Sequence, residues 1–222
     1  MVQEDYREFL PLFTEAVYNV LPPHHIYDHS IPLKEGSQPP FRPLYSLSRN
    51  ELIAVRKWLD TDLRRGWIQN SSSLDGVLVL FVKEADGSLR LCVNYRGLNE
   101  IMIKDRYPLP LIHETLVQLS KANYFTKLDI KDAYYLAGMA EGEEWKTPFQ
   151  TQYALFKSLV MRMGLTNTPA TFQKFINDIL RPFLDQFCTA FLNDILIYSD
   201  TLGEHKIHVR QVLEVLKGAG LT

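Results

Sequence analysis

The sequence predicts an α+β fold in which an antiparallel sheet is covered by helices on one face. Three observations indicate this class. Strand-like and helix-like stretches are interleaved along the 222 residues, and no repeat period is evident. Residues 188–198 have the pattern of a tight hairpin, and residues 124–130 form another strand-like run with an acidic side chain. This length allows one large domain or two modest domains that share a core.

The N-terminal part is expected to hold a short helix, an extended connector that runs over the surface, and a strong helix. Residues 1–20 carry an amphipathic helical pattern, whereas residues 21–43 are rich in proline and lack apolar periodicity. Ser48, followed three residues later by Glu51, forms a capping box. A helical stripe then runs to Gly66, which ends the helix. The stripe consists of Leu52, Val55, Leu59 and Leu63.

Two strands and a helix are expected next. The β-rich runs at 78–83 and 89–94 are joined through Asp86-Gly87, which is a hairpin signal. Pro108 is expected to introduce a helix that continues to Leu119, because proline suits the first turn of a helix.

The C-terminal half alternates short strands with two longer helices. Residues 133–140 are expected to form a turn or a short helix, and residues 156–161 a strand. Thr168-Pro169 supplies an N-cap and a proline at the first helical position, which opens a helix to about Leu184. A last helix is expected at 203–218. Its apolar face consists of Val209, Val212, Leu213 and Leu216.

Composition excludes some function classes without identifying one. The apolar content of 46% is typical of a folded protein, and the net charge of −2 gives no overall basic footprint for nucleic acid. No apolar stretch approaches the roughly 20 residues that span a bilayer, and the N-terminus lacks a signal-peptide pattern. We therefore expect an intracellular, non-secreted protein in which Cys92 and Cys188 are buried free thiols. His205 and His208 are expected on a partly solvated helix face rather than in a metal site.

The acidic residues of the strand and the hairpin form the candidate site. The run at 124–130 carries Asp129, and the apolar arms at 188–192 and 195–198 flank Asn193-Asp194. A strand-borne carboxylate beside a carboxylate-bearing hairpin can hold two Mg²⁺ ions roughly 4 Å apart for phosphoryl transfer. The structural alternatives are a strand-end aspartate that caps a turn and an ordinary hairpin-turn aspartate.

Six strings, in a fixed order, carry a resemblance to a known family. They are DGSLRLCVNYRGLN (86–99), RYPLP (106–110), KLDI (127–130), EWKT (144–147), GLTN (164–167) and ATFQ (170–173), and DILIYS (194–199) continues the match. Together they closely resemble the reverse transcriptase of Gypsy-type LTR retrotransposons, from about Leu21 to the end of the chain. Each string is weak alone, but their combination in the family's order is specific.

The resemblance implies the fingers and palm of a right-hand polymerase. Residues 1–40 would form an N-terminal helix and extended connector, 41–119 the fingers, and 120–222 the palm. The thumb and RNase H domains of the family are absent here, which implies a piece of a Pol polyprotein that also contains protease and integrase. The implied activity is template-directed addition of dNTPs to a primer 3′-hydroxyl on RNA or DNA, in a cytoplasmic particle or the nucleus, without a membrane partner.

The resemblance also assigns roles to residues. Asp129, Ile130 and Asp194 would bind two Mg²⁺ ions, and Asn193 occupies the position of the hairpin's first catalytic carboxylate. Arg90 would grip the triphosphate, and Tyr134 would pack under the incoming sugar and exclude a 2′-hydroxyl. A surface arginine and a core aromatic are the respective alternatives. The implied nucleotide-binding residues are Lys83, Arg90, Ile130, Lys131, Asp132, Ala133, Tyr134 and Met163.

Departures from the family pattern indicate impaired activity. An amide is neutral and cannot bridge two cations as a carboxylate does, so we expect Asn193 to leave the chain nearly inactive. A loss of about 4 kcal/mol would slow chemistry roughly a thousandfold. Glu84 stands where relatives commonly carry a second lysine, and it is expected to repel the nucleotide. Arg162-Met163 replaces Pro-Phe and is expected to alter the floor of the nucleotide pocket.

Further substitutions suggest a decaying genomic copy. One G-to-A transition at the first codon position converts the family's usual residue into the one found here at four positions. These are Asn94, Lys157, Thr168 and Asn193. The hypotheses are therefore a disabled polymerase, a non-catalytic polymerase fold that binds primer-template or pairs with an active subunit, and a remnant without function.

Overall fold

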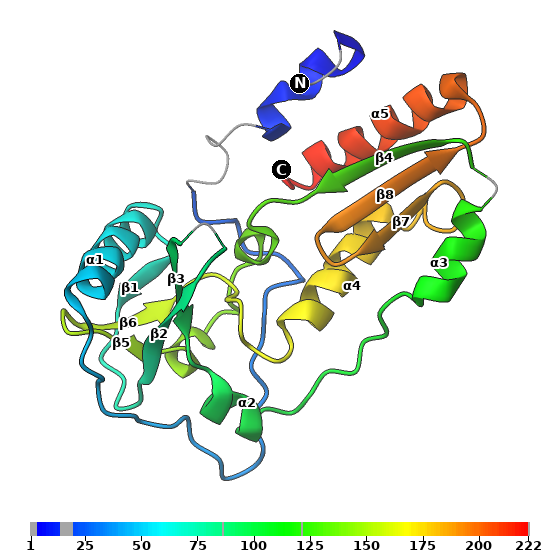
Figure 1. The fold of residues 1–222 in the computed structure, drawn as a ribbon. Helices are drawn as coiled ribbons and strands as arrows, with labels where there is room; N and C mark the ends of the chain where they lie inside the picture. The colour runs from blue at the N-terminus through cyan, green and yellow to red at the C-terminus, as the bar shows by residue number, and fades with distance from the viewer. Residues whose placement is uncertain (1–3, 14–19, 86, 121, 222) are drawn as a thin grey trace. The chain divides into compact units, whose positions relative to one another are not determined.

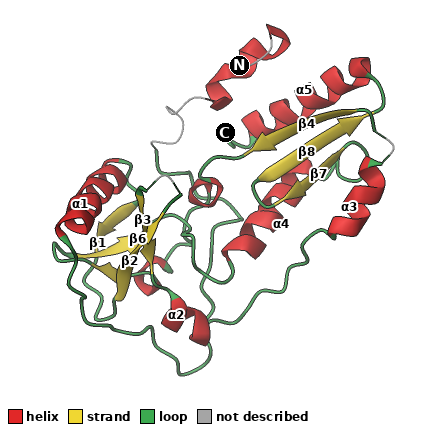
Figure 2. Cartoon of the chain, viewed as in Figure 1, coloured by secondary structure: helices red, strands yellow, loops and turns green. Residues whose placement is uncertain are grey.

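The computed structural model describes residues 4–13, 20–85, 87–120 and 122–221 (Figure 1). The chain forms two compact units, each assembled from segments distant in sequence. One comprises Asn19–Asp105 and Tyr134–Thr168, and the other comprises the described residues of Met1–Tyr18, Arg106–Ala133 and Pro169–Thr222. Both combine a sheet with helices (Figure 2), so the predicted α+β class is confirmed. We call them the five-stranded unit and the three-stranded unit after their sheets.

The sheet of the five-stranded unit has the order β1-β6-β5-β2-β3. The predicted hairpin is its β2–β3 pair, and Gly87 at the turn has a φ of 83°, which favours glycine. β5 runs parallel to β2, whereas the other neighbouring strands are antiparallel. The strands are β1 (Ile68–Asn70), β2 (Val77–Lys83), β3 (Leu89–Val93), β5 (Phe149–Gln150) and β6 (Leu155–Ser158).

Helix α1 (Arg49–Arg64) begins at the predicted capping box. The Ser48 side chain accepts a hydrogen bond from the Glu51 backbone N–H, and the Ser48 backbone N–H donates to Glu51 Oε2 at 2.7 Å. Val55 and Leu59 are buried in the core of this unit as predicted, whereas Leu63 is exposed. A short helix that the sequence did not predict, α2 (Arg96–Ile101), follows β3.

The proline-rich connector is extended, but part of it is buried. Ile31 is fully buried, and its backbone N–H donates to Glu143 Oε2 at 2.8 Å. Its carbonyl accepts a hydrogen bond from Lys146 Nζ at 2.8 Å. Both side chains lie at or beside the 3₁₀ helix η4 (Glu144–Lys146). The prediction of a connector that runs only over the surface is therefore wrong at this position.

The sheet of the three-stranded unit has the order β4-β8-β7, with both pairs antiparallel. Its strands are β4 (Tyr124–Asp129), β7 (Cys188–Phe191) and β8 (Asp194–Ser199), and its helices are α3 (Ile112–Leu119), α4 (Thr168–Leu180) and α5 (Leu202–Gly218). Helix α5 packs against β8 and β4 (Figure 1). It buries the apolar face predicted for the last helix.

Two helices differ from their predicted bounds. The helix expected at Pro108 begins at Ile112, because the backbone of its N-cap, Leu111, is extended (φ −80°, ψ 124°). Helix α4 ends at Leu180 instead of about Leu184, because Pro182 disfavours helical geometry at the preceding residue, Arg181.

One cysteine, Cys92, and one histidine of the last helix differ in burial from their predictions. Both cysteines are free as predicted, but only Cys188 is buried, and Cys92 is half-buried. His205, expected on a partly solvated face, is buried, and its Nδ1 lies 2.9 Å from Ser199 Oγ. The neighbouring strand β8 covers this histidine, so the helical pattern alone could not indicate its burial.

The N-terminal segment packs on α5 within the three-stranded unit. Residues Glu4–Phe13 form the 3₁₀ helix η1, which is kinked at Tyr6. Lys206 Nζ lies 2.7 Å from Asp5 Oδ2, and Arg210 forms an ion pair with Glu8. The side chains of Phe9 and Leu12 are buried. The remaining residues of the helix predicted at 1–20 lie mostly outside the described residues. Among the described helices, none has both the length and the apolar character to cross a membrane.

Candidate active site

The acidic strand end and the hairpin meet in the three-stranded unit. In the antiparallel register of β4 and β8, Asp129 is the direct partner of Asp194. Such partners have Cα atoms about 4.5–5.5 Å apart. The turn differs by one residue from the prediction, because Leu192 and Asn193 form its tip and Asp194 already belongs to β8. This shift is what places Asp194 opposite Asp129.

A buried glutamine of α4 braces this unusual turn. Leu192 has a φ of 54°, a left-handed conformation that a leucine rarely adopts and that costs on the order of 1 kcal/mol. Gln173 is fully buried, and its Oε1 accepts a hydrogen bond from the Leu192 backbone N–H at 2.8 Å. Its Nε2 donates to the Ala190 carbonyl at 3.0 Å. Gln173 belongs to one of the family strings, but no pattern in the sequence pointed to this role.

Both carboxylates already have partners within the chain. Asn193 Nδ2 donates to Asp129 Oδ1 at 3.0 Å, and the Asn193 carbonyl accepts from the Ile130 backbone N–H at 2.9 Å. Lys127 Nζ lies 2.9 Å from Asp194 Oδ1. This hydrogen bond, together with the charge of Asp194, raises the pKa of the Lys127 ammonium. Sequence reasoning did not identify Lys127 as a partner of the site.

The donor set does not fit a two-ion Mg²⁺ site. Mg²⁺ prefers oxygen ligands, and two ions need bridging carboxylates. Asp129 and Asp194 supply two carboxylates, whereas Asn193 directs its NH₂ group, which cannot bind a cation, at Asp129. Within the described ranges, no group of three or more His, Cys, Asp or Glu side chains could hold a metal ion. A neutral amide at this position therefore leaves too little negative charge for two divalent ions.

The segment after Asp129 turns sharply. Ile130 is buried, as is Ala133 at the start of the 3₁₀ helix η3 (Ala133–Leu136), and Lys131 and Asp132 are exposed between them. Asp132 has a φ of 52°, a left-handed conformation that aspartate tolerates better than most residues. This element confirms the turn or short helix expected at 133–140.

The other predicted nucleotide-binding residues belong to the five-stranded unit. Lys83 is exposed at the end of β2. Arg90 is exposed on β3, where its Nε lies 2.5 Å from Glu84 Oε1. Tyr134 is half-buried, and burial raises the pKa of its hydroxyl. Met163 is 52% exposed. The predicted residues are thus divided between the two units.

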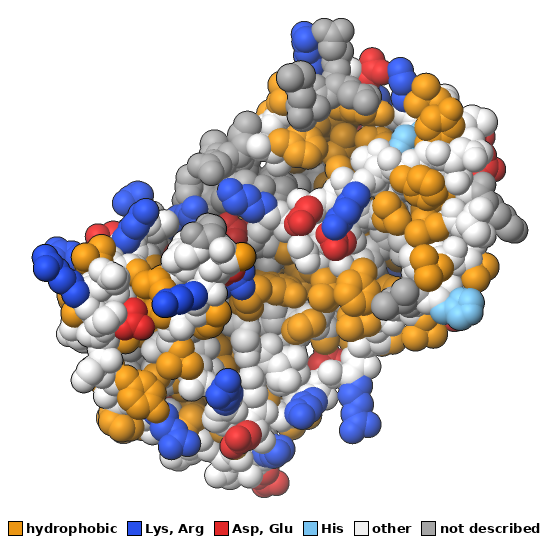
Figure 3. Space-filling model, viewed as in Figure 1, with side chains coloured by type: hydrophobic (Ala, Val, Ile, Leu, Met, Phe, Trp, Pro, Cys, Tyr) orange, Lys and Arg blue, Asp and Glu red, His pale blue; other side chains and the backbone are white. Residues whose placement is uncertain are grey.

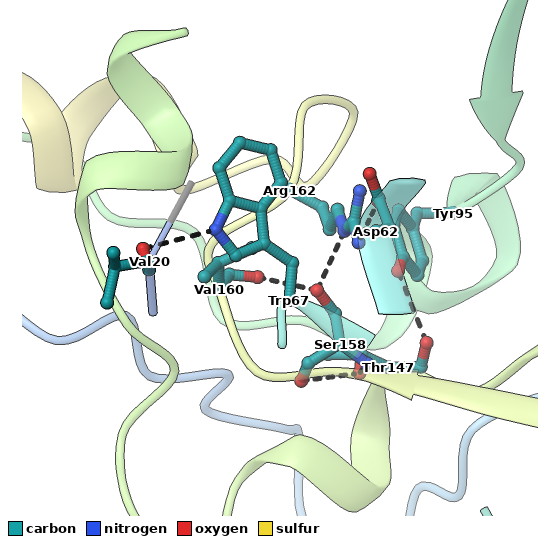
Figure 4. A network of polar contacts seen from close by, with 8 residues as sticks. All are labelled: Val20, Asp62, Trp67, Tyr95, Thr147, Ser158, Val160 and Arg162. Carbon is teal, nitrogen blue, oxygen red and sulfur yellow. Dashed lines mark hydrogen bonds and ion pairs between the residues drawn. The ribbon is translucent and has the colours of Figure 1, made fainter. Parts of the chain in front are cut away.

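A buried polar network in the five-stranded unit was not expected from the sequence (Figure 4). Arg162 and Asp62 are each 3% exposed, and Arg162 Nη2 lies 2.8 Å from Asp62 Oδ2. Arg162 Nε donates to Ser158 Oγ at 2.7 Å. Burial is the largest single influence on the pKa of Arg162 and lowers it, but Asp62 together with Tyr135 and Tyr95 produces a net rise. The pair is separated by 100 positions in the sequence, so no local pattern could have indicated it.

The visible surface does not concentrate basic side chains. In Figure 3, Lys and Arg are scattered among acidic and apolar residues rather than gathered in one patch. This distribution agrees with the formal net charge of −2.

Comparison with known sequences places the chain in a family. Residues 82–222 match the family described as "Reverse transcriptase (RNA-dependent DNA polymerase)". The chain is 35% identical over 218 residues to the Transposon Tf2-3 and Tf2-7 polyproteins of Schizosaccharomyces pombe. These alignments cover 97% of this chain and 16% of each relative.

Solved structures share the fold. A foamy viral protease-reverse transcriptase in complex with double-stranded DNA has a TM-score of 0.82 at 18% identity, covering 100% of this chain and 40% of that chain. The same type of protein in complex with an RNA/DNA hybrid has a TM-score of 0.79 at 18% identity, covering 99% and 30%. At this identity the likeness shows the fold alone. The family match over residues 82–222 shows that the chain belongs to the reverse transcriptase (RNA-dependent DNA polymerase) family.

Proposed function

We propose that this chain is the fingers and palm portion of a retrotransposon reverse transcriptase whose polymerase chemistry Asn193 strongly impairs. The fingers would span 41–119, and the palm at 120–222 would contain the strands that bear Asp129 and Asp194. The chain spans 16% of the length of the curated relatives it matches, so it would work within a longer Pol polyprotein, in a cytoplasmic particle or the nucleus. Its substrates would be dNTPs and a primer on an RNA or DNA template.

The hydrogen bond from Asn193 Nδ2 to Asp129 Oδ1 carries this proposal. An aspartate at 193 would set a third carboxylate beside Asp129 and Asp194, and like charges this close favour a bound cation. The amide instead satisfies Asp129 without a metal. The Glu84–Arg90 ion pair supports the same conclusion, because Glu84 engages the arginine expected to grip the triphosphate.

Primer extension tests the proposal. Asn193→Asp is introduced into the parent polypeptide that contains this chain, and Mg²⁺-dependent extension of a primer on an RNA template is measured. We expect a gain of about a thousandfold, equivalent to about 4 kcal/mol of transition-state stabilisation. Asn193→Ser, which also removes the amide but adds no charge, is the matched control and should stay inactive. Equal rates for the two variants would contradict the proposal.

A second candidate function is non-catalytic binding of primer-template or pairing with an active subunit. The observation in its favour is that Asn193 and Lys127 satisfy both carboxylates without a metal, which reduces their repulsion of phosphate. Binding to an RNA–DNA hybrid in a gel shift, without extension by either the unchanged polypeptide or its Asn193→Asp variant, would favour this function. The absence of both binding and extension would favour a remnant without function.

A further inference from the structure

Arg162 is held in a site that suits a guanidinium. Its central carbon lies 5.1 Å from the ring centroid of Trp58 and 5.2 Å from that of Tyr135. Within the same plane of donors, its Nη2 reaches Asp62 and its Nε reaches Ser158 (Figure 4). A flat guanidinium can lie against two aromatic rings and direct its N–H groups at Asp62 and Ser158, whereas a lysine ammonium has neither a flat face nor several donors in one plane.

The residues that follow Arg162 form a turn with its backbone fixed on both sides of Met163. The Arg162 carbonyl accepts a hydrogen bond from Thr168 Oγ1 at 2.9 Å. Two residues on, the Gly164 carbonyl accepts from Asn99 Nδ2 at 2.7 Å, and Gly164 has a φ of 101°, which favours glycine. Between these anchors, Met163 is half exposed to solvent.

We propose that Arg162 is a positioning residue for Met163: its buried guanidinium, held by Asp62, Ser158 and two aromatic rings, fixes the turn that presents Met163 to the incoming nucleotide. The nucleotide contact rests on the proposed function, but the anchoring of the turn does not. The Met163 side chain is half exposed and the Arg162 side chain is buried. Loss of the contacts of the Arg162 side chain is therefore expected to increase the mobility of Met163.

The test separates positioning from simple stabilisation. Arg162→Met combined with Asp62→Leu removes both buried charges, and replacement of a buried ion pair by apolar residues is often neutral or stabilising. We expect the double variant to keep its melting temperature while the turn loses its anchor. Arg65→Met is the matched control, because Arg65 also lies over an aromatic ring, 4.5 Å from the centroid of Trp67, but outside the turn.

Two measurements report on the position and mobility of Met163 in the turn. In this chain labelled with ¹³C-methyl methionine, the Met163 methyl signal is assigned by adding Met163→Leu to each variant, because Arg162→Met and Arg65→Met each add a methyl group. This signal should narrow and shift toward the position of free methionine in the double variant only. In a parent polypeptide carrying Asn193→Asp, the double variant should raise the KM for dNTPs about tenfold with kcat changed less than about twofold. The Arg65→Met control should change neither.

An unchanged Met163 signal in a folded double variant would overturn the proposal. If the double variant does not fold, the Arg162→Lys variant tests the proposal instead. It keeps the positive charge of Arg162 but lacks the several donors and flat faces of the guanidinium. The Arg162→Lys variant should shift the Met163 signal, and an unchanged signal would overturn the proposal. If the parent polypeptide with Asn193→Asp fails to extend primers, the proposed function is contradicted. The Met163 methyl signal then still tests whether Arg162 anchors the turn.

Discussion

Beside the tip of the β7–β8 hairpin, Asp129 of β4 and Asp194 of β8 have partners of different kinds. Lys127 is 61% exposed and Asp194 is 45% exposed, and ion pairs of this kind contribute less than about 1 kcal/mol. A divalent cation can therefore displace Lys127 from Asp194. Asn193 is different, because its side chain is neutral and directs a competing donor at Asp129. We therefore propose that residue 193, and not Lys127, limits metal binding at this site.

His29 gives the five-stranded unit a pH-dependent stability. Its side chain is fully buried, and burial lowers its pKa from 6.5 to about 4, although the charges of Glu143 and Asp105 act in the opposite direction. The neutral form is thus favoured in the folded state. This contribution is fully present above pH 6.5 and is lost as the pH falls toward 4.

We predict that His29→Gln flattens this dependence. Between pH 7.5 and pH 5, the unchanged protein should lose about 2 kcal/mol of unfolding free energy that the His29→Gln variant does not lose. Urea denaturation at both pH values measures the difference, with His113→Gln, at an exposed histidine of α3, as the control. Parallel losses in the unchanged protein and the His29→Gln variant would show that His29 is not responsible.

At the scale of elements, the β7–β8 hairpin depends on α4 for its shape. Gln173 of α4 makes hydrogen bonds to the backbone at the strained Leu192 and at Ala190 before it. We predict that Gln173→Met, which keeps the volume, destabilises the protein by about 2–4 kcal/mol because two buried backbone groups lose their partners. Urea denaturation measures the loss. Lys174→Met, at the neighbouring exposed position of the same helix, should change stability by less than about 0.5 kcal/mol.

Elements whose signals are local were predictable, and those that depend on distant partners were not. The capping box of Ser48 and Glu51 set the start of α1 correctly, because both residues act within one turn. The hairpin was predicted one residue out of register, because the left-handed Leu192 is held by Gln173 of another element. Strands β1 and β5 were missed since two or three residues carry no period. The Arg162–Asp62 pair joins α1 to a distant loop, so it needed the tertiary structure.

At the scale of the whole molecule, the candidate site draws on segments that are separated in the chain. The three-stranded unit contains Asp129, Asn193 and Asp194. These residues come together only because the segment that begins at residue 106 pairs with the segment that begins at residue 169. The family strings predicted this convergence, and the β4–β8 register confirms it. The roles of Lys83, Arg90, Tyr134 and Met163 in nucleotide binding, and the domain bounds at 40 and 119, stay predictions.

Binding of Mn²⁺, a paramagnetic substitute for Mg²⁺, tests most directly whether Asn193 weakens metal binding at the site. The free Mn²⁺ concentration is measured by electron paramagnetic resonance during titration of this chain and of its Asn193→Asp and Lys127→Met variants. We predict a gain in Mn²⁺ affinity of about tenfold or more for Asn193→Asp, equivalent to about 1.4 kcal/mol, and a gain of less than about threefold for Lys127→Met. Equal affinities of the unchanged chain and Asn193→Asp, or a larger gain from Lys127→Met, would contradict this prediction.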